Sequence, residues 1–153
     1  MRDWGFRLDN FKKASRACLF FGLPALFVLI TYGIFYKGYH PLWRSVLVIL
    51  LIYPVWGLIQ QFALQVFVNK NLRELGMGLG IRVPIVALLF GLSHFPNYPL
   101  MVLVLILGLA TTLIYEKTPN IPALAILHGF LGTLAYFLVL GLDPAAELFH
   151  ALS

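Results

Sequence analysis

Long apolar runs alternate with short polar segments along this chain. Residues 17–36 carry no charge and, at about 1.5 Å per helical residue, are long enough to cross a hydrocarbon layer of about 30 Å. Residues 45–68 and 121–142 are apolar runs of similar length. We predict that these three segments are transmembrane helices.

A fourth apolar stretch is too long for one straight helix. No charged residue lies between Arg82 and Glu116, and a straight helix of that length would measure about 50 Å. The stretch is interrupted by FPNYP at residues 95–99, where two prolines disfavour a continuous helix. The sequence therefore predicts a hairpin of two arms, residues 83–94 of about 18 Å and residues 100–115 of about 24 Å, that crosses the bilayer twice or only enters it.

The N-terminal segment has a different pattern. In residues 1–16, Trp4, Leu8 and Phe11 recur at i, i+4 and i+7 among basic residues, which is typical of a short helix at the membrane interface. A basic terminus that only flanks the first span is the alternative. Residues 1–153 are thus predicted to form one all-α integral membrane domain, a polytopic bundle of about five transmembrane or re-entrant helices.

Composition supports a membrane location and excludes a soluble domain. Hydrophobic residues make up 61% of the chain and charged residues 11%, and the mean hydropathy is +0.90. The net charge is +5, but the basic residues lie at the ends of apolar runs and form no polar face. We therefore expect contacts with membrane lipids and no nucleic-acid partner.

The distribution of basic residues also predicts an orientation. With a cytoplasmic N-terminus, all of the 11 lysine and arginine residues except Lys37 and Arg44 would lie on the cytoplasmic side. The C-terminus would then lie outside.

Polar side chains occur at membrane depth in three predicted helices. Counted from the cytoplasmic ends, Gln60 and Gln61 lie about 13 Å deep, His94 about 17 Å and His128 about 11 Å. Gln65 follows Gln61 on the same helical face. Two interpretations remain open: these groups join helices by hydrogen bonds, or they form a hydrated pocket.

The order of these residues resembles a family of intramembrane proteases, the CPBP (CAAX protease and bacteriocin-processing) family. The family has the motif EExxxR on one helix, FxxxH on the next helix and HxxxN on the last helix, and the resemblance covers residues 53–141. The first motif is replaced here by Gln60, Gln61 and Gln65; the second is unaltered as Phe90 and His94; the third reads His128 and Gly132.

The resemblance implies a catalytic role for Gln60, Gln61, His94 and His128, which would hold the attacking water, a metal or the oxyanion. It also implies a substrate pocket near four further residues, Gln65, Phe90, Asn97 and Gly132. However, an amide is not a general base near neutral pH. His94 and His128 could bind a divalent metal such as zinc, but an ordinary zinc site needs a third strong ligand.

The glutamines replace the two acids and the arginine together. An arginine left alone in the membrane would cost several kcal/mol, so the joint replacement indicates a self-consistent uncharged network.

Two functions follow from the resemblance. The protein cleaves a membrane-associated or lipidated peptide with His94 or His128 as the base, or it is an inactive pseudoprotease that binds such a peptide, as in bacteriocin immunity. A bacterial inner membrane is the expected location. Ser93 is not expected to form a dyad with His94, because helical neighbours point about 100° apart, and Glu116 is expected to be a cap or an exposed charge paired with Lys117.

Overall fold

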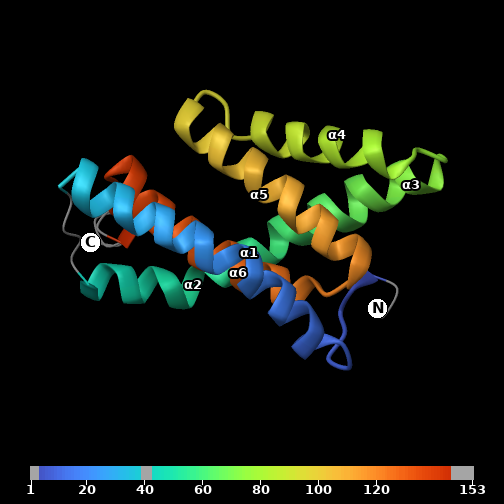
Figure 1. The fold of residues 1–153 in the computed structure, drawn as a ribbon, viewed down its shortest axis with the longest axis horizontal. Coiled ribbons are helices and arrows are strands. Elements are labelled where there is room, and N and C mark those ends of the chain that lie inside the picture. The colour runs from blue at the N-terminus through green and yellow to red at the C-terminus, as the bar shows by residue number, and fades with distance from the viewer. Residues whose placement is uncertain (1–3, 39–42, 146–153) are drawn as a thin grey trace.

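The computed structural model describes residues 4–38 and 43–145, and these residues form helices joined by turns (Figure 1). The helical elements follow one another in this order: α1 (Phe11–Thr31) and the π-helix η2 (Tyr32–Tyr36); α2 (Trp43–Phe62), the π-helix η3 (Ala63–Lys70) and α3 (Asn71–Glu74); α4 (Leu79–Leu92); α5 (Tyr98–Lys117); α6 (Ile121–Leu134) and the π-helix η4 (Ala135–Leu140). The predicted all-α bundle is confirmed.

Four helical stretches are long and apolar enough to cross a membrane. They are Phe11–Tyr36, Arg44–Glu74, Tyr98–Lys117 and Ile121–Leu140. The 14-residue α4 is shorter, about 21 Å. The second arm of the hairpin is longer than predicted, because α5 has 20 residues and reaches about 30 Å.

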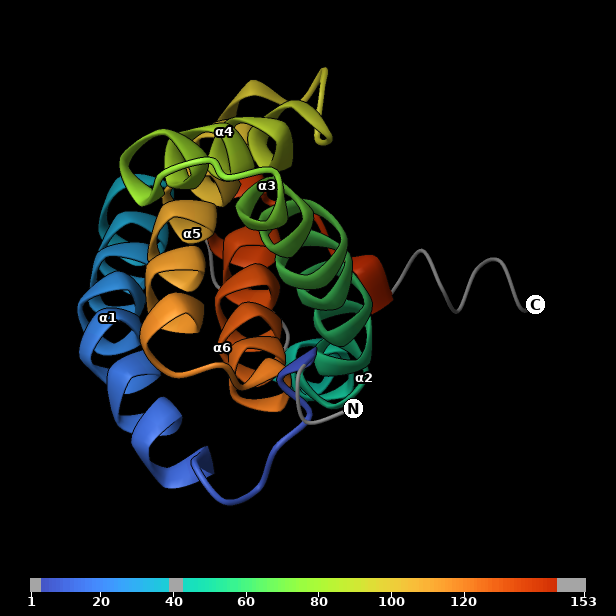
Figure 2. The ribbon, with the colours of Figure 1, turned by 90° about the vertical axis from the view of Figure 1, so that its right-hand side faces the viewer.

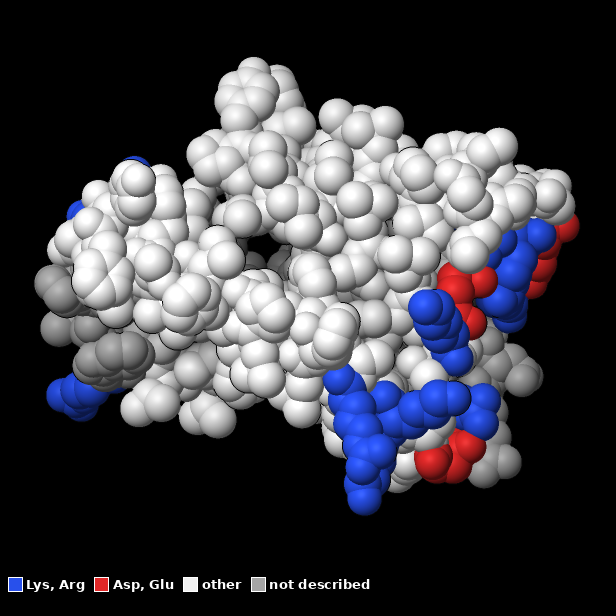
Figure 3. All heavy atoms as spheres, in the orientation of Figure 1, with Lys and Arg blue, Asp and Glu red and all other residues white. Residues whose placement is uncertain are grey.

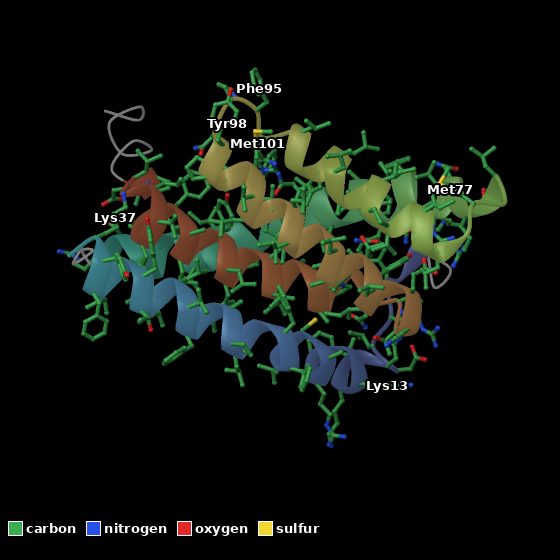
Figure 4. All side chains as sticks on the ribbon, turned by 45° about the horizontal axis from the view of Figure 1, so that its top comes forward. Lys13, Lys37, Met77, Phe95, Tyr98 and Met101 are labelled. Carbon is green, nitrogen blue, oxygen red and sulfur yellow. The ribbon has the colours of Figure 1, made fainter. Side chains whose placement is uncertain are left out.

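Charged side chains gather at the ends of the bundle and leave its middle uncharged. Figure 3 shows a concentration of them where α1 begins and α5 ends, next to a broad uncharged surface. Lys13 and Lys37 lie at opposite ends of the helical stretch formed by α1 and η2 (Figure 4). This distribution and the four long apolar helices identify an integral membrane protein, whereas the orientation of the termini stays a prediction.

Helix α6 lies at the centre of the bundle, beside α1, α2 and α5 (Figure 2). Within its spanning stretch 61% of the residues are buried, compared with 22% for the stretches that contain α1 and α2. Its close contact with α2 depends on glycines. A Cβ atom at Gly129 would lie 2.8 Å from the Cα of Pro54, and one at Gly57 would lie 2.8 Å from the carbonyl oxygen of Ala125. Small residues therefore let the two backbones approach.

The helix break falls where the prolines predicted it. Helix α4 ends at Leu92 and α5 begins at Tyr98. The Oδ1 atom of Asn97 accepts a hydrogen bond from the backbone N–H of Leu100 at 3.1 Å, and Pro99 occupies the first turn, where its missing N–H is not needed. Phe95 and Tyr98 project from this turn (Figure 4).

The N-terminal segment differs from the predicted interfacial helix of residues 1–16. Residues 4–10 form turns and α1 begins only at Phe11, while residues 1–3 lie outside the described part. The carbonyl oxygens of Gly5 and Arg7 accept hydrogen bonds from the Ile121 N–H at 2.8 Å and the Asn120 Nδ2 at 2.6 Å. The segment therefore folds against the start of α6, where its carbonyl oxygens accept from the first N–H of that helix and from the side-chain amide of its N-cap residue.

Candidate active site

A cavity of about 430 Å³ lies between α1, α5 and α6. Most of its lining is apolar. Its polar side chains are those of Tyr53, His94, His128 and Tyr136. In Figure 3 a hollow is visible on the uncharged surface, between the places that α1 and α5 occupy in Figure 1. The cavity therefore lies at membrane depth.

His128 forms part of the cavity wall from α6. Its side chain is buried, and its Nδ1 atom lies 3.3 Å from Nε2 of Gln61. The Tyr53 ring stands edge-on to the imidazole, with 6.4 Å between the ring centroids. A Cβ atom at Gly132 would come within 2.5 Å of the Tyr53 ring. Gly132, which also lines the cavity, thus leaves the room that Tyr53 needs beside His128.

His94 lies in the turn that follows α4 and lines the same cavity as His128. It is half-buried, and its Nδ1 atom lies 2.9 Å from the carbonyl oxygen of Phe90. A carbonyl oxygen can only accept, so we assign the proton of the neutral ring to Nδ1 and the lone pair to Nε2. The Phe90 ring contacts both imidazoles, at centroid distances of 5.2 Å from His94 and 5.6 Å from His128.

Ser93 lies closer to His94 than the sequence predicted, because both residues have left the helix. Its Oγ atom is 3.1 Å from Nδ1 of His94 and donates to the Phe90 carbonyl oxygen at 2.8 Å. Since Nδ1 already carries a proton, it cannot take one from the hydroxyl group. In this tautomer the pair cannot act as nucleophile and base, although the two side chains lie in contact and do not point apart as predicted.

The glutamines lie behind the cavity wall. Gln61 and Gln65 are fully buried, and Gln65 Nε2 donates to Oε1 of Gln61 at 3.4 Å and to Oγ1 of Thr112 at 3.2 Å. Gln60 has a buried Oε1 atom without a hydrogen-bond partner in the part of the chain that is described. The structure thus brings His94 and His128 to one cavity and Gln61 against His128, while Gln60 is not among the residues that line the cavity.

A buried ion pair extends this network toward the charged end. Arg82 is 4% exposed and lies 2.6 Å from Oε2 of Glu116. Asn69 joins the pair: its Oδ1 accepts from Arg82 Nε at 2.8 Å, and its Nδ2 donates to Glu116 Oε1 at 2.9 Å and to Gln65 Oε1 at 3.3 Å. A continuous chain of polar contacts therefore links the ion pair to His128.

The prediction that Glu116 is an exposed charge paired with Lys117 is wrong. Helix α4 begins at Leu79, before the predicted arm, and so carries Arg82 against the end of α5. Sequence reasoning also missed Asn69. The signal was present, because Asn69 continues the four-residue spacing of Gln61 and Gln65.

The donor set does not fit an ordinary hydrolytic metal site. Within residues 4–38 and 43–145, no group of three or more His, Cys, Asp or Glu side chains could hold a metal ion. One nitrogen of His128 is already engaged by Gln61. Two imidazoles alone lack the third strong ligand that zinc requires.

Comparison with known families gives one match. Residues 41–134, more than half of the chain, match the family profile described as "Type II CAAX prenyl endopeptidase Rce1-like". No curated protein and no solved structure matches the chain. The matched region contains both cavity histidines and the glutamine-substituted motif.

Proposed function

We propose that this chain, which belongs to the family of Rce1-like type II CAAX prenyl endopeptidases, holds a membrane-associated or lipidated peptide in the cavity between α1, α5 and α6. The observation that carries the proposal is an apolar cavity of about 430 Å³ with two imidazoles in its wall. Apolar walls suit a lipid chain or an apolar side chain, and a few placed polar groups suit a peptide bond. The hollow on the uncharged surface (Figure 3) is compatible with entry from the bilayer.

Peptide hydrolysis is the first form of this function. His94 has an unshared pair on Nε2 and would take a proton from water while the water oxygen bonds to the peptide carbonyl carbon. The C–N bond then breaks, and the imidazolium returns the proton to the leaving amine. His128, on the facing element, would contact the carbonyl oxygen.

Holding without cleavage is the second form, and one observation favours it. No carboxylate is among the described residues that line the cavity. Glu116 is already bound by Arg82 and Asn69 at the charged end of the bundle. Such a pseudoprotease would act as a peptide-binding or immunity-type protein. We propose a bacterial inner membrane with a cytoplasmic N-terminus for either form.

Reconstitution in liposomes separates the two forms. The full chain would be incubated with lipidated peptide libraries that carry a photo-crosslinker, and both cleavage and crosslinking would be measured. Turnover that is lost in His94→Ala and in His128→Ala, but kept in Ser93→Ala, supports hydrolysis. Crosslinking in the cavity without turnover supports holding. Absence of both refutes the proposal.

A restored motif gives a sharper test of natural activity. The triple variant Gln60→Glu, Gln61→Glu, Gln65→Arg supplies the acids and the arginine of the family motif. Cleavage that appears only in this variant shows that the natural protein holds its peptide and does not cut it. Equal cleavage by the natural chain shows that the histidines suffice.

A further inference from the structure

The chain of polar contacts behind His128 begins at groups that cannot reverse their hydrogen bonding. An arginine side chain only donates hydrogen bonds, and an ionised carboxylate only accepts them. Arg82 Nε faces Oδ1 of Asn69, and Glu116 Oε1 faces its Nδ2. A flipped Asn69 amide would oppose donor to donor and acceptor to acceptor. The ion pair therefore fixes the orientation of this amide.

The fixed orientation passes along the helix face. Because the Asn69 Nδ2 donates to Gln65 Oε1 at 3.3 Å, the Gln65 amide nitrogen turns away from Asn69. It donates in turn to Oε1 of Gln61 at 3.4 Å. The Gln61 nitrogen is then left to face Nδ1 of His128, 3.3 Å away. The orientation of each amide group is thus determined by the preceding one in the order Asn69, Gln65, Gln61.

We infer that the Arg82–Glu116 pair and Asn69 are positioning residues that hold the His128 imidazole in the tautomer with its proton on Nε2. Nδ1 accepts from Gln61, so Nε2 carries the hydrogen in the neutral ring. Nε2 is also the nitrogen left for a substrate, since His128 lines the cavity. His128 therefore presents a hydrogen-bond donor, which suits a carbonyl oxygen.

The two cavity histidines are consequently opposite in character. His94 donates through Nδ1 to the Phe90 carbonyl oxygen and keeps an acceptor on Nε2. His128 accepts through Nδ1 and keeps a donor on Nε2. The use of these two groups rests on the proposed function. A bound peptide would meet the acceptor of His94 on one side and the donor of His128 on the other.

Nitrogen NMR of the histidine rings tests the inference without any substrate. The chain would be labelled with ¹⁵N-histidine in lipid nanodiscs, and the His128 resonances assigned by their loss in His128→Asn. Two-bond couplings to the ring protons distinguish the protonated nitrogen from the unprotonated one. We expect the Nε2–H tautomer of His128 to predominate about five- to tenfold, as one neutral hydrogen bond allows. A predominant Nδ1–H tautomer overturns the inference.

Remote variants test the role of the ion pair. In Asn69→Leu, Gln65 keeps only Gln61 and the Thr112 hydroxyl, which can donate or accept. Both directions of the Gln65 amide are then similarly satisfied, and the tautomer ratio of His128 should fall toward that of an imidazole without a directing hydrogen bond. Thr112→Val removes the buried hydroxyl group that Gln65 contacts but leaves the ion pair unchanged. This control variant should keep the natural tautomer ratio.

A second variant covers the case in which Asn69→Leu does not fold. Arg82→Gln with Glu116→Gln keeps polar side chains but removes both fixed directions, and it should lower the tautomer ratio in the same way. An unchanged ratio in the folded remote variants overturns the inference. The readout is independent of peptide binding, so it can succeed or fail whatever the reconstitution assay shows.

Discussion

Removal of the Glu116 carboxylate would leave the Arg82 guanidinium buried without its counter-charge. Breaking one side of a buried ion pair costs about 3–5 kcal/mol. Arg82 would keep its hydrogen bonds to Asn69 Oδ1 at 2.8 Å and to the Met77 carbonyl oxygen at 3.0 Å. We therefore expect Glu116→Leu to lower the free energy of unfolding by about 3 kcal/mol, at the lower end of that range.

The exposed pair Lys70–Glu74 supplies the matched control. Its atoms are 3.9 Å apart and the Glu74 side chain is 61% exposed, so Glu74→Leu should cost no more than about 0.5 kcal/mol. The free energy of unfolding would be measured in mixed micelles by titration with SDS, followed by circular dichroism. The double variant Arg82→Met, Glu116→Leu should recover most of the loss, because no buried unpaired charge remains and Arg73, which also lies 3.9 Å from Glu116, is half exposed. A Glu116→Leu variant as stable as Glu74→Leu would refute the reasoning.

Three further variants test other contacts. Gly129→Ala should destabilise the bundle by about 1–3 kcal/mol, because the new methyl group meets the α2 backbone. Gly80→Ala is the control, because its methyl group meets nothing within 4 Å. The SDS midpoints of the two variants would be compared, and equal midpoints would contradict the prediction. Asn120→Ala should cost about 1–2 kcal/mol, since its Oδ1 caps α6, and protease nicking near the N-terminus should increase as that segment is released. Val28→Trp should reduce crosslinking of lipidated peptides at least several-fold because Val28 lines the cavity, while Phe27→Trp, outside the lining, serves as the control.

The sequence predicted the helices well because bilayer thickness limits their lengths. The uncharged stretch before Glu116 was too long for one span, and its prolines located the break between Leu92 and Tyr98. Rise per residue also placed His94 and His128 at similar depths. In the structure both histidines line one cavity.

The ion pair escaped prediction for a physical reason. Hydropathy treats charged residues as the ends of spans, and so Arg82 and Glu116 marked the two ends of the apolar stretch. It cannot show that a hairpin returns its ends to one place, where opposite charges 34 residues apart in sequence meet. The fold of the N-terminal segment was not predicted for a similar reason, because helical periodicity carries no information about the Ile121 N–H of α6 to which the segment binds.

The π-helical turns of η3 have a geometric consequence for the stripe of amides. In an α-helix a step of four residues overshoots a full turn by about 40°, so Gln61, Gln65 and Asn69 would gradually wind around the axis. The wider turns of Ala63–Lys70 rotate each residue less and counter this drift. Deleting one residue within that stretch would restore ordinary winding and rotate Asn69 out of line with its neighbours. The π-helical segment thus keeps Gln61, Gln65 and Asn69 aligned along one face of the helix, whereas an α-helix would turn them gradually away from that face.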